Sequence, residues 1–496
     1  MTLQKARRVL IVGAGPGGLT AAMILGKRGC EVEVFEKQPQ VGGRNARITL
    51  GDFHFDLGPT FLMLKEVLDK VFAEAGADSG SLLQFKRLDP MYRLQFADSR
   101  RLEPTADQAA MQQEIARVFP GRESTYQRFL AREGKRFARL YSCLEQPCHT
   151  LGSMFSLRLL KALPHLAPGK SLYDLLSGYF TDPQLSLSFT FQAKYLGMSP
   201  WECPGLFAII PYIEHHFGIY HVLGGLNRIS GQMAATAASN GVRLHLNAPV
   251  RSLLLDGRRV RGLILEDGRE IHGDEVIINA DFAHAMTNLV PPGVLRKYSP
   301  EQLAKKRFSC STFMLYLGVD KLYQIPHHTI VFARDYRKNV EEIFNGGSFS
   351  QDFSFYVHNP SITDGSLAPS GQSAVYILVP SSNLRGSVDW PHEAVAIRER
   401  VLDALESRGG MPDLRQHIVA EKMLTPQDWQ DEYSVYAGAT FNLAHNFSQM
   451  LYLRPRNRFE ELEHCYLVGG GTHPGSGLPT IYQSGLIAAN LITAPD

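Results

Sequence analysis

The chain has 496 residues, of which 44% are hydrophobic and 20% are charged. This composition predicts a folded globular protein of about three domains and excludes disordered, collagen-like and low-complexity proteins. The 51 Lys and Arg residues nearly balance the 49 Asp and Glu residues, so the charge gives no reason to expect a nucleic acid as partner.

Two further features bear on where the protein works. The six cysteines are scattered, with only Cys143 and Cys148 close together, which favours reduced thiols over a disulfide framework. No run of about 18 apolar residues occurs, so we expect no membrane-spanning helix. The start of the chain also lacks a secretory cleavage pattern. We therefore expect a cytoplasmic protein.

The first 35 residues predict a complete strand–helix–strand unit. Residues 8–12 are a short aliphatic run typical of a buried parallel strand, and residues 31–35 predict a second strand. Residues 19–28 are rich in Ala, Leu, Ile and Met and are followed by Gly29, which predicts a helix between the two strands.

The turn after the first strand carries Gly13, Gly15 and Gly18 in the spacing Gly-x-Gly-x-x-Gly. Glycines in this context allow a tight turn, the close approach of a pyrophosphate and close packing of the helix on the sheet. Glu36 ends the second strand, where a carboxylate can accept hydrogen bonds from a ribose hydroxyl. We expect a dinucleotide here, and only one, because no second motif of this kind follows.

Residues 66–219 contain several amphipathic stretches separated by prolines, which predict a largely helical insertion that faces the substrate or a membrane. Residues 151–170 are basic and amphipathic, with Phe155 and Leu159 on one helical face and Arg158 beside it. Such a helix either lies on a membrane surface or packs its apolar face against the core.

Beyond residue 242 the hydrophobic period changes to that of strands. Strands are predicted at 242–247, 250–255, 260–265 and 275–279. Asp-Gly pairs after two of these runs, at Asp256 and Asp267, predict hairpin turns.

Residues 465–468 predict a final strand, followed by a glycine cluster from Gly469 to Gly477 and a helix from about Thr480 to Ile492. Backbone amides in such a loop can approach a ligand closely, and a helix N-terminus favours negative charge.

The predicted fold class is α/β, with a Rossmann-like nucleotide-binding domain and a mixed substrate domain. We expect the nucleotide-binding domain to be discontinuous, with the helical insertion and the mixed sheet–helix substrate domain filling the gaps. The boundaries are 1–65, 220–295 and 440–496 for the first, 66–219 for the insertion and 296–439 for the substrate domain.

The segment Gly42-Gly43-Arg44 resembles the flavoprotein group that includes amine oxidases, carotenoid desaturases and Rab GDP-dissociation inhibitors. The segment from Gly470 to Thr480 closely resembles the C-terminal signature of bacterial-type carotenoid desaturases. The middle blocks are most similar to the C30 branch, which desaturates diapophytoene and squalene. Similar blocks occur at residues 53–60, 194–204, 220–227, 309–318 and 366–369.

The resemblance implies an FAD-dependent oxidoreductase that acts on CH–CH bonds and introduces conjugated double bonds stepwise into a linear polyisoprenoid. The C30 substrates 4,4'-diapophytoene and squalene are expected ahead of C40 phytoene. Oxygen or a quinone would accept the electrons, and the protein would associate peripherally with the inner face of the cell membrane. The alternatives are a carotenoid end-group oxidase and, more distantly, a flavin amine oxidase or a non-catalytic isoprenoid carrier.

The resemblance and the glycine motif together give an expected set of FAD contacts from four parts of the chain. These are Gly13, Ala14, Gly15, Gly18, Glu36, Lys37, Gly43, Arg44, Gly58, Pro59, Val250, Gly470, Gly471 and Leu478.

No catalytic base is assigned, because no acidic residue in 151–170 can be carried over from the family. His473 is the one candidate, and its place in the glycine cluster favours a structural role. The adjacent pairs His215–His216 and His327–His328 do not predict a metal site, because neighbouring side chains point in different directions.

Overall fold

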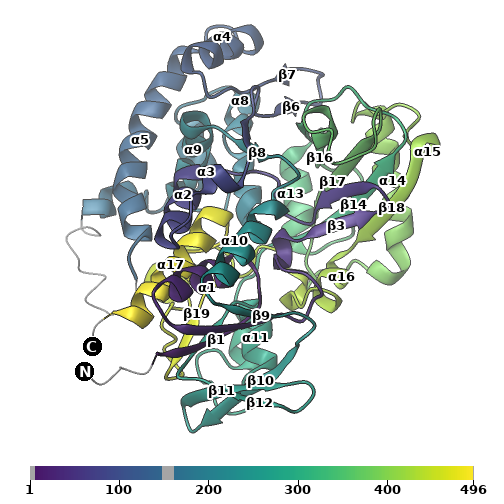
Figure 1. Cartoon of the computed structure of the whole chain (residues 1–496). Coiled ribbons are helices and arrows are strands. Elements are labelled where there is room, and N and C mark those ends of the chain that lie inside the picture. The colour runs from purple at the N-terminus through teal and green to yellow at the C-terminus, as the bar shows by residue number, and fades with distance from the viewer. Residues whose placement is uncertain (1–5, 148–160, 495–496) are drawn as a thin grey trace.

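The computed structural model describes residues 6–147 and 161–494. Figure 1 shows two regions that each contain a sheet, with a group of helices beside them at the upper left. Phe155, Arg158 and Leu159, which were predicted to lie on a basic amphipathic helix, are outside the described residues. None of the helices in the described ranges is long and apolar enough to cross a membrane.

A parallel five-stranded sheet forms the centre of the first region. Its strand order is β19-β13-β1-β2-β9, and every pairing in it is parallel. Segments far apart in the chain therefore meet in one sheet, and the predicted Rossmann-like α/β class is confirmed. The strands are β1 Arg8–Val12, β2 Glu31–Phe35, β9 Arg243–His245, β13 Glu275–Ile278 and β19 Cys465–Leu467.

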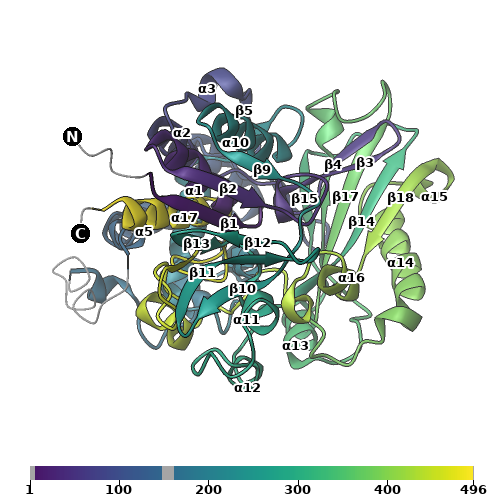
Figure 2. The same cartoon turned by 60° about the horizontal axis from the view of Figure 1, so that its bottom comes forward.

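Both faces of this sheet are covered, which explains the unbroken aliphatic run in β1. Val9 and Ile11 pack into the cluster formed with three helices, whereas Leu10 and Val12 pack on the opposite side. Figure 2 shows the sheet between the helices and a small antiparallel sheet. The helices are α1 Pro16–Lys27, α10 Asn227–Ser239 and α17 Leu478–Thr493, and the strands are β10 Val250–Asp256, β11 Arg259–Leu265 and β12 Glu270–His272.

A seven-stranded sheet forms the second region, in the order β18-β14-β17-β16-β15-β6-β7. Only the β15–β6 pair is parallel. Successive residues of β14 lie on opposite faces of this sheet. Phe313 packs under helix α14 Trp390–Ser407, whereas Met314 and Tyr316 lie on the other, inner face. The strands are β6 Arg93–Gln95, β7 Arg101–Leu102, β14 Ser311–Val319, β15 His328–Val331, β16 Phe355–His358, β17 Ser373–Ser381 and β18 Ile418–Leu424.

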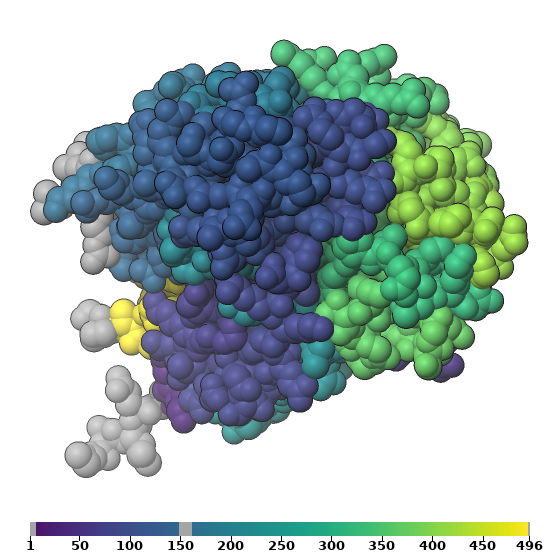
Figure 3. All heavy atoms as spheres, turned by 90° about the horizontal axis from the view of Figure 1, so that it is seen from above, coloured from purple at the N-terminus to yellow at the C-terminus, as the bar shows by residue number. Residues whose placement is uncertain are grey.

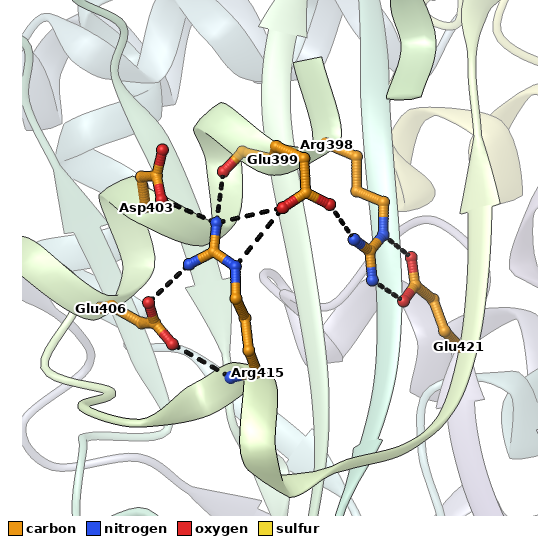
Figure 4. Close-up of polar contacts among 6 residues, drawn as sticks. All are labelled: Arg398, Glu399, Asp403, Glu406, Arg415 and Glu421. Atoms are coloured by element: carbon orange, nitrogen blue, oxygen red, sulfur yellow. Dashed lines mark hydrogen bonds and ion pairs between the residues drawn. The ribbon is translucent and has the colours of Figure 1, made fainter. Parts of the chain in front are cut away.

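Ion pairs fasten α14 to its neighbours on the outer side of this sheet (Figure 4). Arg398 binds both carboxylate oxygens of Glu421 on β18 at 2.5 Å. Arg415, on helix α15 Leu414–His417, binds Asp403 at 2.7 Å and Glu406 at 2.5 Å.

The segment predicted to be a helical insertion is mainly helical, and Figure 3 shows it in blue against the green atoms of the second region. It also contains three short strands that the sequence did not predict. β5 Phe85–Arg87 pairs with β8 Tyr220–Val222, and β6 and β7 extend the seven-stranded sheet. Strands of two or three residues are too short to show a period. Beyond residue 100 its helices include α4 Gln108–Val118, α5 Ser124–Leu144, α7 Leu172–Ser177, α8 Pro183–Ser188 and α9 Ile209–Phe217.

Smaller elements complete the two regions. The hairpin of β3 and β4 packs against the inner face of the seven-stranded sheet. These elements are β3 Arg47–Leu50, β4 Phe53–Asp56, α2 Lys65–Glu74, α3 Ser79–Leu82, α11 Phe282–Asn288, α12 Pro300–Ala304, α13 Tyr336–Asn345 and α16 Pro426–Asp431.

Candidate functional site

A cavity of about 670 Å³ lies between the two regions. One end is bounded by the turn after β1 and by the ends of β1 and β2. The other end is bounded by the inner face of the seven-stranded sheet, including Met314 on β14 and Tyr376 on β17. The cavity therefore runs from the glycine motif into an apolar, aromatic space.

The glycine turn leaves the start of α1 open to the cavity. Gly13 has φ 93°, and a Cβ atom on it would lie 2.7 Å from the carbonyl oxygen of Asn279. Gly15 caps α1 without a capping side chain, and Pro16 follows it. A Cβ atom on Gly18 would collide with the Gly13 carbonyl. The turn thus holds a free helix N-terminus at the cavity wall, which is a suitable site for phosphate.

Asn279 was not predicted, yet it holds this turn in place. Its Nδ2 donates to the carbonyl oxygens of Gly13 at 3.0 Å and Gly15 at 3.2 Å. It follows β13 directly. Its position at the carboxyl end of a predicted strand was the one signal available from the sequence.

Glu36 directly follows β2 at the cavity wall and is buried. One carboxylate oxygen accepts from the Ala14 amide at 2.8 Å and the other from the Gln38 amide at 2.9 Å. Each oxygen keeps a further lone pair, so the carboxylate can still accept hydrogen bonds from a vicinal diol. Ala14 itself is not among the lining residues.

Arg44 lies at the cavity, but its terminal nitrogens bind protein groups. One donates to Asp281 at 3.1 Å and the other to the carbonyl of Thr440. Burial raises the pKa of Asp281, and the charge of Arg44 opposes that rise. This ion pair fixes the guanidinium beside the glycine-turn end of the cavity, and its remaining N–H groups can still donate to a ligand.

The remaining predicted contacts divide between the cavity wall and the layer behind it. Gly18 and Gly471 are not in the wall, and a Cβ atom on Gly471 would lie 2.5 Å from the Cβ of Phe282. Lys37 lines the wall and donates to the Ser434 hydroxyl at 2.7 Å. Those in the wall are Gly13, Gly15, Glu36, Lys37, Gly43, Arg44, Gly58, Pro59, Val250, Gly470 and Leu478.

The C-terminal glycine cluster is held by a buried arginine that the sequence did not indicate. Arg454 is fully buried and donates to the carbonyls of Gly470 at 2.7 Å and Thr472 at 3.1 Å. It also donates to the carbonyl of Gln449 at 3.2 Å. Helix α17 then starts at Leu478 after Gly477, which has φ 111°.

His473 is buried behind the cluster and is not a lining residue. Its Nε2 donates to the carbonyl of Gln146 at 2.9 Å. Burial lowers the pKa of this imidazole to about 4. These contacts give His473 a structural position in the loop.

The far end of the cavity has an aromatic wall with two polar features. Lys194 has its Nζ buried without a hydrogen-bond partner in the described residues, 4.7 Å above the ring of Phe344. Burial lowers its pKa to about 8. The Tyr356 hydroxyl contacts Thr60 Oγ1 at 2.8 Å and His328 Nδ1 at 2.7 Å. The aromatic residues are Phe61, Phe191, Tyr195, Phe332, Tyr336, Tyr356, Tyr376, Trp429, Tyr433 and Phe441.

Comparison with known proteins identifies the relatives of this chain. The model of the flavin containing amine oxidoreductases matches residues 16–493. The chain is 53% identical to the 4,4'-diapophytoene desaturase (4,4'-diapolycopene-forming) of a Methylomonas species, over 99% of this chain and 96% of that one. It is 36% identical to the all-trans-zeta-carotene desaturase of Myxococcus xanthus, over 98% and 93%. A putrescine oxidase bound to putrescine shares the fold, with a TM-score of 0.65, 16% identity and 99% coverage of both chains.

Proposed function

Since the chain belongs to the flavin-containing amine oxidoreductase family and, within it, to the carotenoid desaturases, we propose that it introduces double bonds stepwise into a linear C30 polyisoprenoid. It is an FAD-dependent oxidoreductase that acts on CH–CH bonds. The observation that carries the substrate proposal is the continuity of one cavity from the glycine turn to the aromatic wall.

The residues at the nucleotide end fit FAD. The N-terminus of α1, which no side chain caps, suits the pyrophosphate, and the spare lone pairs of Glu36 suit the adenosine ribose. In this proposal Gly13 and Gly15 hold the pyrophosphate, while Gly470 and Leu478 lie beside the flavin. The domain that holds it would comprise residues 1–65, 220–295 and 440–496, which supply all five strands of the parallel sheet.

The aromatic wall suits a long hydrocarbon. Each methylene that leaves water stabilises the complex by about 0.8 kcal/mol, so a cavity without many polar groups can bind a polyisoprenoid firmly. The 53% identity to a C30 desaturase, against 36% to a ζ-carotene desaturase, supports the C30 length.

Dehydrogenation removes a hydride from one carbon and a proton from its neighbour, and FAD supplies the hydride acceptor. The protein has to align the chain, exclude water and accept the proton. The Tyr356 hydroxyl is placed to take a proton from the substrate while passing its own proton to His328 Nδ1. Burial and neighbouring histidines hold the pKa of His328 well below its usual range, so its imidazole is neutral before this step and would hold the transferred proton only weakly. Oxygen or a quinone would then receive the electrons.

We also infer a peripheral association with the inner face of the cell membrane, since the substrate dissolves in lipid. Large apolar side chains are exposed at Leu163, Phe447 and Leu453. Met450 and Leu166, close to them in sequence, pack into the same small cluster. Exposed apolar residues over a shared cluster suit shallow insertion between lipid head groups.

The test supplies the purified, FAD-loaded protein with 4,4'-diapophytoene, squalene or phytoene in liposomes, under air or with a quinone. We expect conjugated products from all steps of desaturation, formed faster from the C30 chains. Faster turnover of phytoene would contradict the length assignment. Oxidation of terminal methyl groups without new double bonds would favour the end-group oxidase.

A further inference from the structure

Three buried histidines meet where the two-stranded sheet of β5 and β8 lies beside the seven-stranded sheet. His221 lies on β8, His327 immediately precedes β15, and His358 ends β16. One ring nitrogen of each lies within 4.8 Å of one ring nitrogen of both others, and all three side chains are buried. None of them lines the cavity, so the desaturation chemistry does not account for this cluster.

Strand pairing brings these residues together from distant positions. In the β15–β16 ladder His328 is opposite His358. The backbone of Asn359 also donates to the carbonyl of His327 at 2.9 Å. His327 thereby lies next to His358, with the Nε2 atoms of the two rings 3.1 Å apart. In a tetrahedral zinc site, Zn–N bonds of about 2.0–2.1 Å place ligand nitrogens about 3.4 Å apart.

Two ring nitrogens in the cluster lack a partner. His221 Nδ1 and His327 Nδ1 are buried and have no hydrogen bond within the described part of the chain. A buried imidazole nitrogen without a partner loses the hydrogen bonds that water would give it. A metal ion can satisfy His221 Nδ1, because neutral imidazole is a common ligand of zinc-class cations. His327 would bind through Nε2, the atom that lies 3.1 Å from His358 Nε2, and would keep its proton on Nδ1.

Asp364 fixes the proton of His221 in the form that a metal ligand needs. Its Oδ2 accepts from His221 Nε2 at 3.0 Å and from the Gly224 amide at 2.7 Å. Its Oδ1 accepts from the Ser366 amide and hydroxyl at 3.0 and 2.6 Å. The carboxylate thus holds a proton on Nε2 and leaves the lone pair on Nδ1, as carboxylates do behind metal-binding histidines.

We propose that His221, His327 and His358 bind a zinc-class divalent cation, with Asp364 as the hydrogen-bond partner of His221 and water as the fourth ligand. The ion would tie β8 to β15 and β16. This connection has structural value, because the chain after β8 leads to α10, where the Leu226 and Asn227 amides bind Asp56 at 2.9 and 2.8 Å. The cation would thus couple the two sheet regions near the cavity.

The test uses untagged, FAD-loaded full-length protein, because a histidine tag would itself bind metal. After incubation with Zn²⁺ and removal of the excess, we expect about one zinc per chain by elemental analysis. The His327→Gln and His358→Gln variants should lose most of this zinc, whereas the matched control His392→Gln, an exposed histidine on α14, should keep it. Flavin content and circular dichroism report whether each variant is folded.

A second measurement does not depend on the variants. Co²⁺ bound to the wild-type protein should give the visible absorption of a four-coordinate site with nitrogen ligands, and Zn²⁺ should displace it. Wild-type protein that retains no more zinc than the His327→Gln, His358→Gln double variant, or that shows only six-coordinate Co²⁺, would contradict the proposal and leave a hydrogen-bonded histidine cluster.

Discussion

At the scale of single residues, the structure agrees best with the sequence where a contact is local. Gly13, Gly15 and Glu36 lie at the cavity because a strand, a turn and a helix within thirty residues fix their positions. Asn279 and Arg454 could not be predicted in the same way. Their partners are set by the tertiary fold, and Asn279 reaches the glycine turn from 266 residues away.

Gly15→Leu tests the nucleotide end of the cavity. A Cβ atom at this position would lie 3.0 Å from Asn279 Nδ2, and the rest of the leucine would occupy the wall beside the start of α1. We expect a folded protein with less than a tenth of the wild-type flavin content, measured by absorbance after denaturation. Gly231→Ala is the control, because a Cβ atom there meets nothing within 4 Å. Full flavin content in Gly15→Leu would refute the assignment.

Tyr356→Phe tests the proton path. It removes the hydroxyl that contacts His328 Nδ1 at 2.7 Å and leaves the aromatic wall in place. Since positioned proton transfer contributes about 10²–10⁴-fold, we expect desaturation to slow by about a hundredfold or more with unchanged flavin content. Tyr376→Phe is matched, because its hydroxyl also lies at the cavity and donates only to the Gly58 carbonyl. Equal rates in the two variants would argue against a proton path through Tyr356.

Glu214→Gln tests a pH dependence of stability. Burial raises the pKa of Glu214 from 4.5 to about 7, against hydrogen bonds from Gln192 and Tyr92. The native state therefore binds more protons than the unfolded state between pH 4.5 and 7. Its stability falls as the pH rises through this window, by about 3 kcal/mol in total.

Because glutamine does not titrate, the variant should lose this part of the slope and gain stability relative to wild type at pH 8. Urea unfolding at pH 4.5, 6 and 8 measures the effect. Glu202→Gln, which alters an exposed carboxylate, should keep the wild-type slope. If the free energy of unfolding of Glu214→Gln depends on pH as steeply as that of the wild type, the Glu214 carboxyl is already ionised in the native protein across this pH range.

At the scale of helices and strands, the hydrophobic period predicted strands that are long enough to show it. The predicted strands at 242–247, 250–255, 260–265 and 275–279 correspond to β9, β10, β11 and β13, whereas β12 was not predicted. Gly257 and Gly268 have the positive φ angles that the hairpin turns require. β6 and β7 were not predicted, because pairing with the edge of the seven-stranded sheet stabilises them and their own sequence does not.

Arg398→Met tests how helix α14 is attached to β18. The guanidinium makes a two-bond ion pair with Glu421, and both side chains are about three-quarters buried. We expect a loss of about 1 kcal/mol in the free energy of unfolding at low salt, and a smaller loss in 1 M NaCl. Arg337→Met, in an exposed pair with Glu341, should change stability by less. Equal, salt-independent losses in both variants would indicate lost packing instead.

At the scale of the whole molecule, the cavity exists because two regions built from interleaved segments face each other. The sequence predicts that distant segments supply the parallel sheet, because a strand followed by a glycine-rich turn is predicted near each end of the chain. The sequence does not predict the depth or the aromatic character of the cavity. Its lining residues come from at least six separated stretches, and only the folded arrangement turns them toward one space.

The last prediction concerns the outer surface. Leu163 and Leu453 are 48% and 50% exposed, and full burial of a leucine side chain is worth about 1.5–3 kcal/mol. Replacing either by Asp should weaken binding to anionic liposomes about tenfold or more, because apolar contact is lost and a negative charge meets the head groups. Flavin content should stay at the wild-type level. Val395→Asp is the matched control, since Val395 is 67% exposed on α14, over the seven-stranded sheet. A wild-type protein that does not cosediment with liposomes, or equal losses in all three variants, would remove this surface from the proposed membrane contact.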